Sequence, residues 1–229
     1  MKDQSHWISL SDMMTWLMLI FMLIAISSIA QQKTALDRYE RTNNDIYIEL
    51  EKTFDDKIEA WNITISKDLT IKFNDPDILF SYASSKINDN FNNILKEFVP
   101  KYIKIINKEE YKNHIKEVRI EGHAKEHCLS QRNNLTKNYI SCIPLSSDRA
   151  KSVLENILRS DYFTTLSEPD TEKMLWWLMS IWMSTGKPLD DLGNPFLLES
   201  STNTPISDKS RRVEFKIVTS SEELIKEIN

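Results

Sequence analysis

The chain has 229 residues, 41% of them apolar and 28% charged, and a net charge of −5. Without a membrane segment about 200 residues remain, which suits one globular domain and a connector. Only three glycines argue against a dinucleotide-binding or loop-dominated enzyme, and basic residues spread along an acidic chain argue against nucleic acid as a partner.

A long apolar run lies near the N-terminus. Residues Met13–Ala30 carry no charge, and a helix that starts at Trp7 spans about 24 residues, or roughly 36 Å, enough to cross a bilayer core of about 30 Å. A cleaved signal peptide fits poorly, because the run is too long, the basic region before it is weak and no clear small-x-small site follows. We therefore predict that residues 1–30 form a short N-terminus and a retained, single-pass transmembrane helix.

The charges that flank this run bear on its orientation. The N-terminal side offers Lys2 and the amino group, whereas the other side offers Lys33, Arg38 and Arg41 among acidic residues. This count weakly opposes a cytoplasmic N-terminus. Large domains are translocated largely regardless of charge, so we give the count little weight.

One carboxylate, Asp12, stands close to the start of the apolar run. If the helix begins at Met13, Asp12 is an N-cap in the interface with no chemical role. If it begins near Trp7, Asp12 lies inside the helix, where a charge must be neutralised, solvated or paired. Such a carboxyl can take up a proton on one side and release it on the other, as an ion-driven motor requires. Roughly one helix face then contains Asp12, Thr15, Leu19, Met22 and Ile26.

Residues 31–60 are highly charged, with sparse apolar residues spaced by three and four. This spacing predicts a connecting helix with one apolar stripe. The stripe either pairs two copies of the chain or packs on the chain's own domain, and the two alternatives stay open. It contains Ile46, Leu50, Phe54, Ile58 and Trp61.

From residue 61 to residue 229, strand-like alternation and helix-like spacing follow one another. The first predicted elements are a β-hairpin in WNITISKDLTIKFND and a helix in SKINDNFNNILKEFVPKYIKII. The apolar residues of that helix at helical spacing are Ile87, Phe91, Ile94, Leu95 and Phe98. A strand in KEVRIEGHA, a helix in LSSDRAKSVLENILR and a closing strand in RRVEFKIV follow. Ser146 or Ser147 is the expected cap of the second helix. This order predicts an α/β domain with one mixed sheet and helices on one face.

Before the closing strand, the segment EKMLWWLMSIWMSTGKP is unusually apolar. The main interpretation is a core helix, whose apolar face contains Met174, Trp177, Leu178, Ile181 and Trp182. Trp176 and Met183 widen that face, so contact with a partner or a membrane surface is the alternative. The run is too short for a second membrane span, and DDLGNPFLLESSTNTPISD after it is predicted to be a loop.

The segment SDMMTWLMLIFMLIAI, with a threonine three residues after the acid, resembles the transmembrane signature of MotB-type stator subunits. It is most similar to the ZorB subunits of Zorya anti-phage systems, which also have a short N-terminus. The resemblance implies that Asp12 carries the transported ion and that Thr15 matches the family threonine. It also implies a homodimer inside a ring of a multi-pass MotA- or ZorA-like partner.

The transported ion is either a proton or sodium. Sodium prefers several oxygen ligands, by extension from hard-cation chemistry, and the helix supplies mainly Ser11, Asp12 and Thr15. We therefore favour protons, although a partner could supply further oxygens. No other cofactor is predicted.

A second resemblance covers Trp61–Val218. The segments DLTIKFNDPDILFSYASSKI, VRIEGHAKE, LSSDRAKSVLENIL and SRRVEF are similar in order and spacing to OmpA-like peptidoglycan-binding domains. The ligand-binding arginine of that family falls on Arg149, the leucine beside it on Leu145 and the late arginine pair on Arg212, while Tyr139 is near enough to contribute. Because an arginine fork binds a carboxylate bidentately, the resemblance implies peptidoglycan as a partner.

Two positions depart from the OmpA-like pattern. The family aspartate that binds the wall amine is Lys125 here, with Glu126 adjacent, and the asparagine three residues before Leu145 is Cys142. Peptidoglycan binding would then use other groups, be weaker or be lost. The alternative for Arg149 is a helix-surface residue.

Cys128 and Cys142 bracket the segment LSQRNNLTKNYIS. In an oxidising compartment they are candidates for a disulfide that closes a loop of about 15 residues and stabilises by roughly 3 kcal/mol. A zinc site with His123 and His127 is the alternative, but its spacing is irregular and no metal is predicted. The sequence contains no convincing nucleophile–base–acid set, phosphate loop or His-Glu-x-x-His motif, so no enzyme is predicted.

Together these observations predict a proton-driven, peptidoglycan-anchored motor subunit of the bacterial inner membrane, and the resemblance to ZorB implies that it acts in anti-phage defence. The N-terminus is expected in the cytoplasm and the C-terminal domain in the periplasm. One alternative is a flagellar stator subunit, which shares the mechanism. Another is a passive wall tether, in which Asp12 is only a cap. A TolR-like energiser fits less well, because the OmpA-like motifs do not belong to that family.

Overall fold

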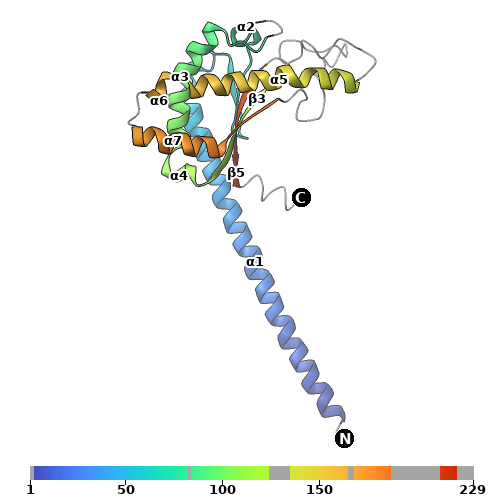
Figure 1. The fold of residues 1–229 in the computed structure, drawn as a ribbon. Helices are drawn as coiled ribbons and strands as arrows, with labels where there is room; N and C mark the ends of the chain where they lie inside the picture. Colours follow the sequence, from blue (N-terminus) through green and yellow to red (C-terminus); the bar gives the residue numbers. More distant parts are fainter. Residues whose placement is uncertain (1–2, 82–83, 124–134, 165–167, 187–211, 221–229) are drawn as a thin grey trace. The chain divides into compact units, whose positions relative to one another are not determined.

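The computed structural model describes residues 3–81, 84–123, 135–164, 168–186 and 212–220. The chain divides into two compact units, Met1–Arg41 and Thr42–Asn229. The second unit contains the whole sheet and the helices that pack on it (Figure 1).

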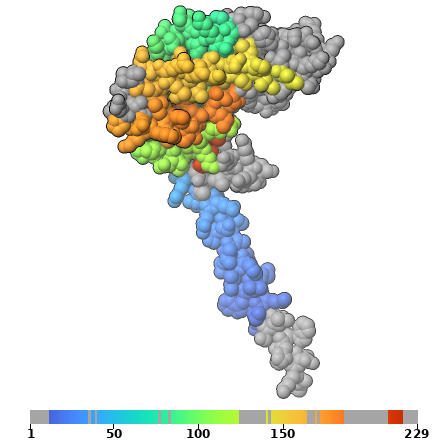
Figure 2. Space-filling model, viewed as in Figure 1, coloured from blue at the N-terminus to red at the C-terminus, as the bar shows by residue number. Residues whose placement is uncertain are grey.

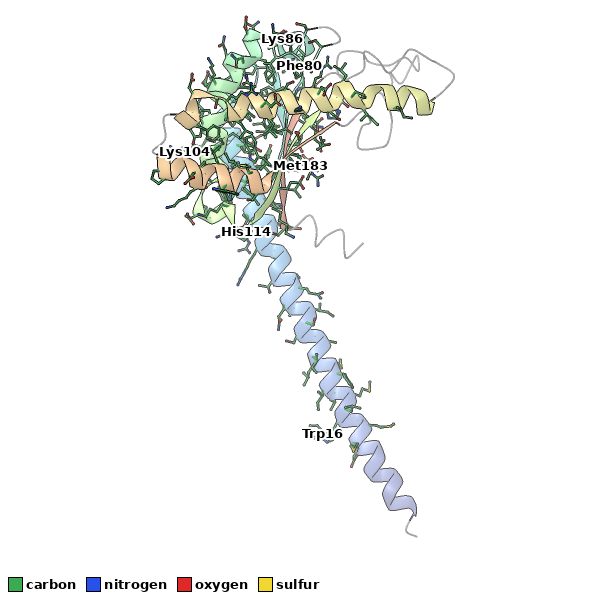
Figure 3. All side chains as sticks on the ribbon, viewed as in Figure 1. Trp16, Phe80, Lys86, Lys104, His114 and Met183 are labelled. Carbon is green, nitrogen blue, oxygen red and sulfur yellow. The ribbon has the colours of Figure 1, made fainter. Side chains whose placement is uncertain are left out.

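The first unit consists of the N-terminal part of helix α1, which spans Asp3–Phe54. No glycine or proline precedes Asp12, so the helix extends back beyond it, and the interpretation of Asp12 as an N-cap is wrong. Within the described residues, Asp12–Thr34 is the one stretch long and apolar enough to cross a membrane, since its 23 residues cover about 35 Å. Its side chains, among them Trp16, are exposed in the isolated chain (Figure 3).

The last turns of α1 belong to the second unit. Ile46, Leu50 and Phe54 are fully buried, and the ring of Trp61 lies 6.3 Å from that of Phe54. The apolar stripe therefore packs in the core of its own domain and is not a surface that pairs two copies. The second unit accordingly begins at Thr42 and includes these turns of α1.

A five-stranded sheet in the order β1-β2-β5-β3-β4 forms the centre of the second unit. The strands are β1 (Ile63–Ile65), β2 (Thr70–Phe73), β3 (Ile115–Gly122), β4 (Trp182–Gly186) and β5 (Val213–Thr219). Neighbouring strands are antiparallel except β3 and β4, which are parallel. The predicted mixed sheet is confirmed, and β1 and β2 form the predicted hairpin.

Alternation along the strands separates an apolar face of the sheet from a charged one. Phe215 on β5 lies opposite Ile120 on β3, and both side chains are fully buried. The residue before it, Glu214, lies opposite Lys72 on β2 and Glu121 on β3. The apolar face packs in the core with the helices, while charged side chains occupy the other face.

The second unit also contains helices of different lengths. They are η1 (Asp55–Lys57), α2 (Pro76–Leu79), α3 (Asp89–Ile106), α4 (Glu109–Lys112), α5 (Leu135–Leu158), α6 (Asp161–Thr164) and α7 (Glu168–Ile181). Helix α5 packs on β3 and β4, and α7 contacts β3 (Figure 1). The helix predicted around Phe91, Leu95 and Phe98 is α3, and all three side chains are buried.

Aromatic rings fill the core between α3 and the sheet. The ring of Phe98 on α3 lies 5.3 Å from that of Phe73 and 5.0 Å from that of Phe215. It also lies 5.1 Å from the ring of Phe54 and 5.0 Å from that of Tyr102. Burial raises the pKa of the Tyr102 hydroxyl, so this group stays neutral in the core.

Phe98→Ala is expected to lower the free energy of unfolding of the domain by about 3–5 kcal/mol, because it removes the ring at the centre of this cluster. Denaturant unfolding of the full chain in detergent micelles, followed by tryptophan fluorescence, measures the change. The control is Ile48→Ala at an exposed position of α1, where the loss should stay under about 1 kcal/mol. Equal losses in the two variants would contradict the packing described here.

Helix α5 starts earlier than the sequence predicted. It spans Leu135–Leu158, so neither Ser146 nor Ser147 is its N-cap. Pro144 lies inside the helix, where it removes one backbone hydrogen bond without ending the helix. The hydroxyl of Ser146 is buried and donates to the carbonyl oxygen of Ile143. Ser146 and Ser147 are typical of a helix start, but the residues before them are already helical, so the predicted cap is wrong.

The tryptophan-rich segment divides into two elements. Helix α7 ends at Ile181, and Trp182–Gly186 continues as β4, which pairs with β3 at the edge of the sheet. The predicted core helix is confirmed for α7, whose Leu178 and Ile181 are buried. The same prediction is wrong for Trp182–Gly186, which forms a strand. Trp176 is 70% exposed and stays on the surface. The loop predicted next lies in 187–211, outside the described residues.

Gly122 allows α5 to lie close to β3. A Cβ atom at this position would lie 2.3 Å from the carbonyl oxygen of Ser146 and 2.8 Å from the nitrogen of Ala150. Both are backbone atoms of α5, so the helix itself would have to move. Gly122→Ala is therefore expected to destabilise the domain by about 2–3 kcal/mol, measured by denaturant unfolding. Wild-type stability would show that α5 is not held this close to the strand.

Candidate functional site

The motif arginine of α5 is buried. Arg149 is 2% exposed, and its Nε and Nη1 groups donate to the carbonyl oxygens of Ser84 at 3.0 Å and His123 at 3.1 Å. The carbon of its guanidinium group lies 5.0 Å from the centre of the Phe80 ring. These contacts orient the guanidinium group and join three segments of the fold. The interpretation of Arg149 as a helix-surface residue is wrong.

His123 links the two motif arginines. Its carbonyl oxygen accepts from Arg149, and its backbone N–H donates to the carbonyl oxygen of Arg212 at 3.0 Å. Because β3 and β5 are adjacent and antiparallel, the residue after β3 lies beside the residue before β5. The structure therefore brings Arg149 and Arg212 to the same end of the sheet.

A buried group of charges lies at this end of the sheet. The Oε1 atom of Glu214 accepts a hydrogen bond from Arg212, and it lies 3.6 Å from Nε2 of His123 and 3.8 Å from Nζ of Lys72. Glu121 lies opposite Glu214 on the neighbouring strand. Like charges at opposed positions destabilise a sheet, so Arg212 and Lys72 offset the repulsion between the two glutamates.

Three of these side chains carry atoms of the kind that bind metals. One ligand atom from each of Glu121, His123 and Glu214 lies within 4.8 Å of the others. The Glu214 oxygen already faces Arg212 and Lys72, whose positive charges would repel a metal ion. The arrangement is therefore that of a charge cluster compensated by basic side chains.

The structure describes some of the other residues that the sequence predicted for this site. Leu145 is buried on α5, one turn before the motif arginine. Tyr139 and Cys142 also lie on α5, but their side chains are outside the described residues, as are Cys128 and Lys125 altogether. The contribution of Tyr139 and the disulfide between the two cysteines stay predictions.

Comparison with known proteins bears on the whole chain. The chain is 30% identical to the Zorya protein ZorB of Escherichia coli (strain ATCC 8739) over an alignment of 235 residues, which covers 99% of this chain and 93% of that protein. The chain belongs to the ZorB family. The resemblance to ZorB predicted from the N-terminal motif is confirmed. No protein-family model matches the chain.

Two solved structures are similar to this ZorB-family chain. One is the cell wall anchor of the T6SS from Pseudomonas aeruginosa, with a TM-score of 0.42, 16% identity and coverage of 75% of this chain and 97% of that one. The other is the periplasmic domain of Helicobacter pylori MotB, with a TM-score of 0.38, 15% identity and coverage of 69% of this chain and 81% of that one.

The predicted ion-carrying residues of this ZorB-family chain lie on α1. Asp12 is inside the helix at the start of the apolar stretch, and Thr15 follows three residues later on a neighbouring part of the same face. Both side chains are exposed in the isolated chain. Inside a bilayer a charged Asp12 needs a second protein surface or water beside it, because hydrocarbon does not solvate the charge.

Sequence reasoning missed five residues of the site around the arginines: Lys72, Phe80, Ser84, Glu121 and Glu214. A signal existed for the two glutamates, because strand alternation places both on the face opposite the apolar residues. No local signal existed for Ser84, which meets Arg149 across 65 residues of sequence.

Proposed function

We propose that this chain is the membrane-anchored subunit of a proton-driven rotary motor that acts in anti-phage defence. One observation carries the proposal: a chain 30% identical to ZorB over nearly its whole length has an acid within its apolar helix. In this proposal the N-terminus is cytoplasmic, α1 crosses the inner membrane once, and the second unit is periplasmic.

Asp12 carries the ion. Its carboxylate takes up a proton from one side of the membrane, and the neutral form is far less costly to hold in hydrocarbon than the charged form. Movement of a neighbouring helix then opens the carboxyl to the other side, where the proton leaves. Thr15 supplies a hydroxyl close to the same helix face. Sodium is the alternative ion and would require further oxygen ligands from the partner.

Rotation requires a second protein. A helix surrounded only by lipid has no surface that separates access from the two sides of the membrane. We propose two copies of the chain inside a ring of a multi-pass MotA- or ZorA-like partner, with each Asp12 facing a partner helix. Proton passage then turns the ring around the pair.

The periplasmic domain anchors the pair to peptidoglycan. Stem peptides of the wall carry carboxylates, which an arginine fork binds bidentately. Arg149 and Arg212 supply this chemistry, with Leu145 and Tyr139 on the same helix as Arg149. Because Arg149 is buried and bonded to Ser84, we expect the segment around Ser84 to open when the wall peptide enters.

The experiment that tests the function compares defence with motility. Cells carrying the native operon, with and without this chain, are challenged with phage, and the chain is also expressed in motile bacteria that lack their flagellar stator subunit. We expect phage protection to disappear without the chain and swimming not to be restored. Restored swimming would assign the chain to a flagellar stator, and unchanged protection would contradict the role in defence.

A further inference from the structure

A cavity of about 480 Å³ lies between α3, α5 and the segment that leads into α3. Cationic and amide side chains line it, including Lys86, Lys96, Arg159, Asn92 and Asn156. Its volume falls within the range of small-molecule sites, about 300–1,000 Å³. None of these lining residues belongs to the charge cluster around the motif arginines.

The three cations of this cavity are available to a ligand. Within the described part of the chain, Lys86, Lys96 and Arg159 form no ion pair. Lys101, one turn further along α3, differs because its Nζ lies 2.9 Å from an oxygen of Glu97. Three cations that no described acid pairs with, placed around one concave surface, attract an anion.

Two carboxylates also line the cavity, Glu155 and Asp161. Glu155 lies 3.8 Å from the ammonium group of Lys151, a residue outside the lining, so its charge is partly offset. Three cations against two acids, one of them offset, make the cavity net positive.

Uncharged polar groups complete the lining. The hydroxyl of Ser160 lines the cavity and is buried without a hydrogen-bond partner among the described residues. Asn156 donates to the side-chain oxygen of Asn92 at 3.0 Å, which leaves the Asn156 oxygen and the Asn92 amide group able to bind a further molecule. A buried polar atom without a partner marks a position that a bound molecule or water can satisfy.

We propose that this cavity is a second wall-binding site that takes a carboxylate-bearing stem-peptide fragment of peptidoglycan. The proposal rests on the wall-anchoring function proposed above. One segment serves both sites, because Ser84 accepts from Arg149 while Ser85 and Lys86 line the cavity. Figure 3 shows Lys86 and Phe80 at the same end of the domain. The wall carries many stem peptides, so two sites on one domain strengthen attachment through avidity.

The test uses the full-length chain in detergent micelles and, as the probe, a soluble disaccharide–tetrapeptide released from purified sacculi. The wild type is expected to bind two probe molecules per chain, one at each site. In the triple variant Lys86→Ala, Lys96→Ala and Arg159→Ala the affinity of the cavity site is expected to fall about tenfold, while that of the site around Arg149 stays unchanged, both measured by calorimetry. Added salt should weaken binding by the wild type more than binding by the variant. Amidation of the probe's carboxylates should likewise weaken binding by the wild type more than binding by the variant.

The matched control removes the same number of exposed positive charges outside the cavity. The variant Lys52→Ala, Lys104→Ala and Lys173→Ala is expected to bind the probe as the wild type does. Figure 3 shows Lys104 well away from Lys86.

The possible results distinguish failure of the second site from failure of the proposed wall anchoring. A binding isotherm of the folded triple variant equal to that of the wild type would overturn the second site and leave wall anchoring intact. No binding by the wild-type chain would overturn wall anchoring, and the second site with it. If the triple variant does not fold, Arg159→Gln at an exposed position replaces it. A cavity-site affinity reduced about threefold would support the site, and an isotherm equal to that of the wild type would overturn it.

Discussion

Asp12→Asn is expected to abolish phage protection while the amount of the chain in the membrane stays unchanged. Asparagine keeps the size of the side chain but cannot bind and release a proton at the carboxyl position. The rest of α1 is untouched, so assembly with the partner should persist. Phage plating on cells that carry the native operon measures protection, and immunoblotting of the membrane fraction measures the amount of protein.

Two variants control this experiment. Asp37→Asn removes an exposed acid from α1 beyond the apolar stretch and is expected to protect fully. Asp12→Glu keeps a titrating carboxyl in a displaced position and is expected to protect in part. Full protection by Asp12→Asn would exclude ion transport through this residue and leave the passive tether as the interpretation.

Arg149→Ala is expected to destabilise the domain by about 2–4 kcal/mol and to weaken binding to purified sacculi, while the cavity between α3 and α5 retains part of that binding. The change removes two charge-assisted hydrogen bonds and leaves the carbonyl oxygens of Ser84 and His123 without these donors. It also removes the guanidinium from the Phe80 ring. Denaturant unfolding of the full chain in micelles and co-sedimentation with sacculi measure the two effects separately.

Arg149→Lys separates charge from geometry. Lysine keeps the positive charge but lacks the planar fork, so we expect partial stability and binding to sacculi as weak as that of Arg149→Ala. Arg119→Gln is the matched control, because Arg119 is a half-buried arginine that pairs with Glu117 of its own strand at 2.7 Å. Its loss of stability should stay under about 1 kcal/mol. An Arg149→Ala chain that sediments with sacculi like the wild type would contradict its role in wall binding.

Much of the fold could be predicted because its signals are local. The hairpin of β1 and β2, helix α3 and strands β3 and β5 each follow from apolar residues spaced by two or by three and four. The apolar stretch that contains Asp12 and Thr15 is equally local, since only length and composition define it. The motif positions Arg149 and Arg212 came from the resemblance to OmpA-like domains, and their role in wall binding stays a prediction.

The sequence-based predictions were wrong where contacts between distant segments override the local secondary-structure preference. Trp182–Gly186 continues an apolar helical pattern, yet it forms strand β4 because the edge of β3 offers hydrogen bonds to its backbone. Ser146 looks like a helix cap, yet α5 passes through it. Ile46, Leu50 and Phe54 suit either a paired helix or a core, and only the packing of the domain assigns them to the core.

The sequence by itself predicted the resemblance to ZorB, the apolar helix with its acid and most strands and helices, because the signal for each lies within one segment. The burial of Arg149, its link through His123 to Arg212 and the cationic cavity between α3 and α5 required the folded chain. Each of these joins groups separated by tens of residues, such as Ser84 and Arg149. Such groups meet only once the sheet pairs and the helices pack, and no periodicity along the chain encodes that meeting.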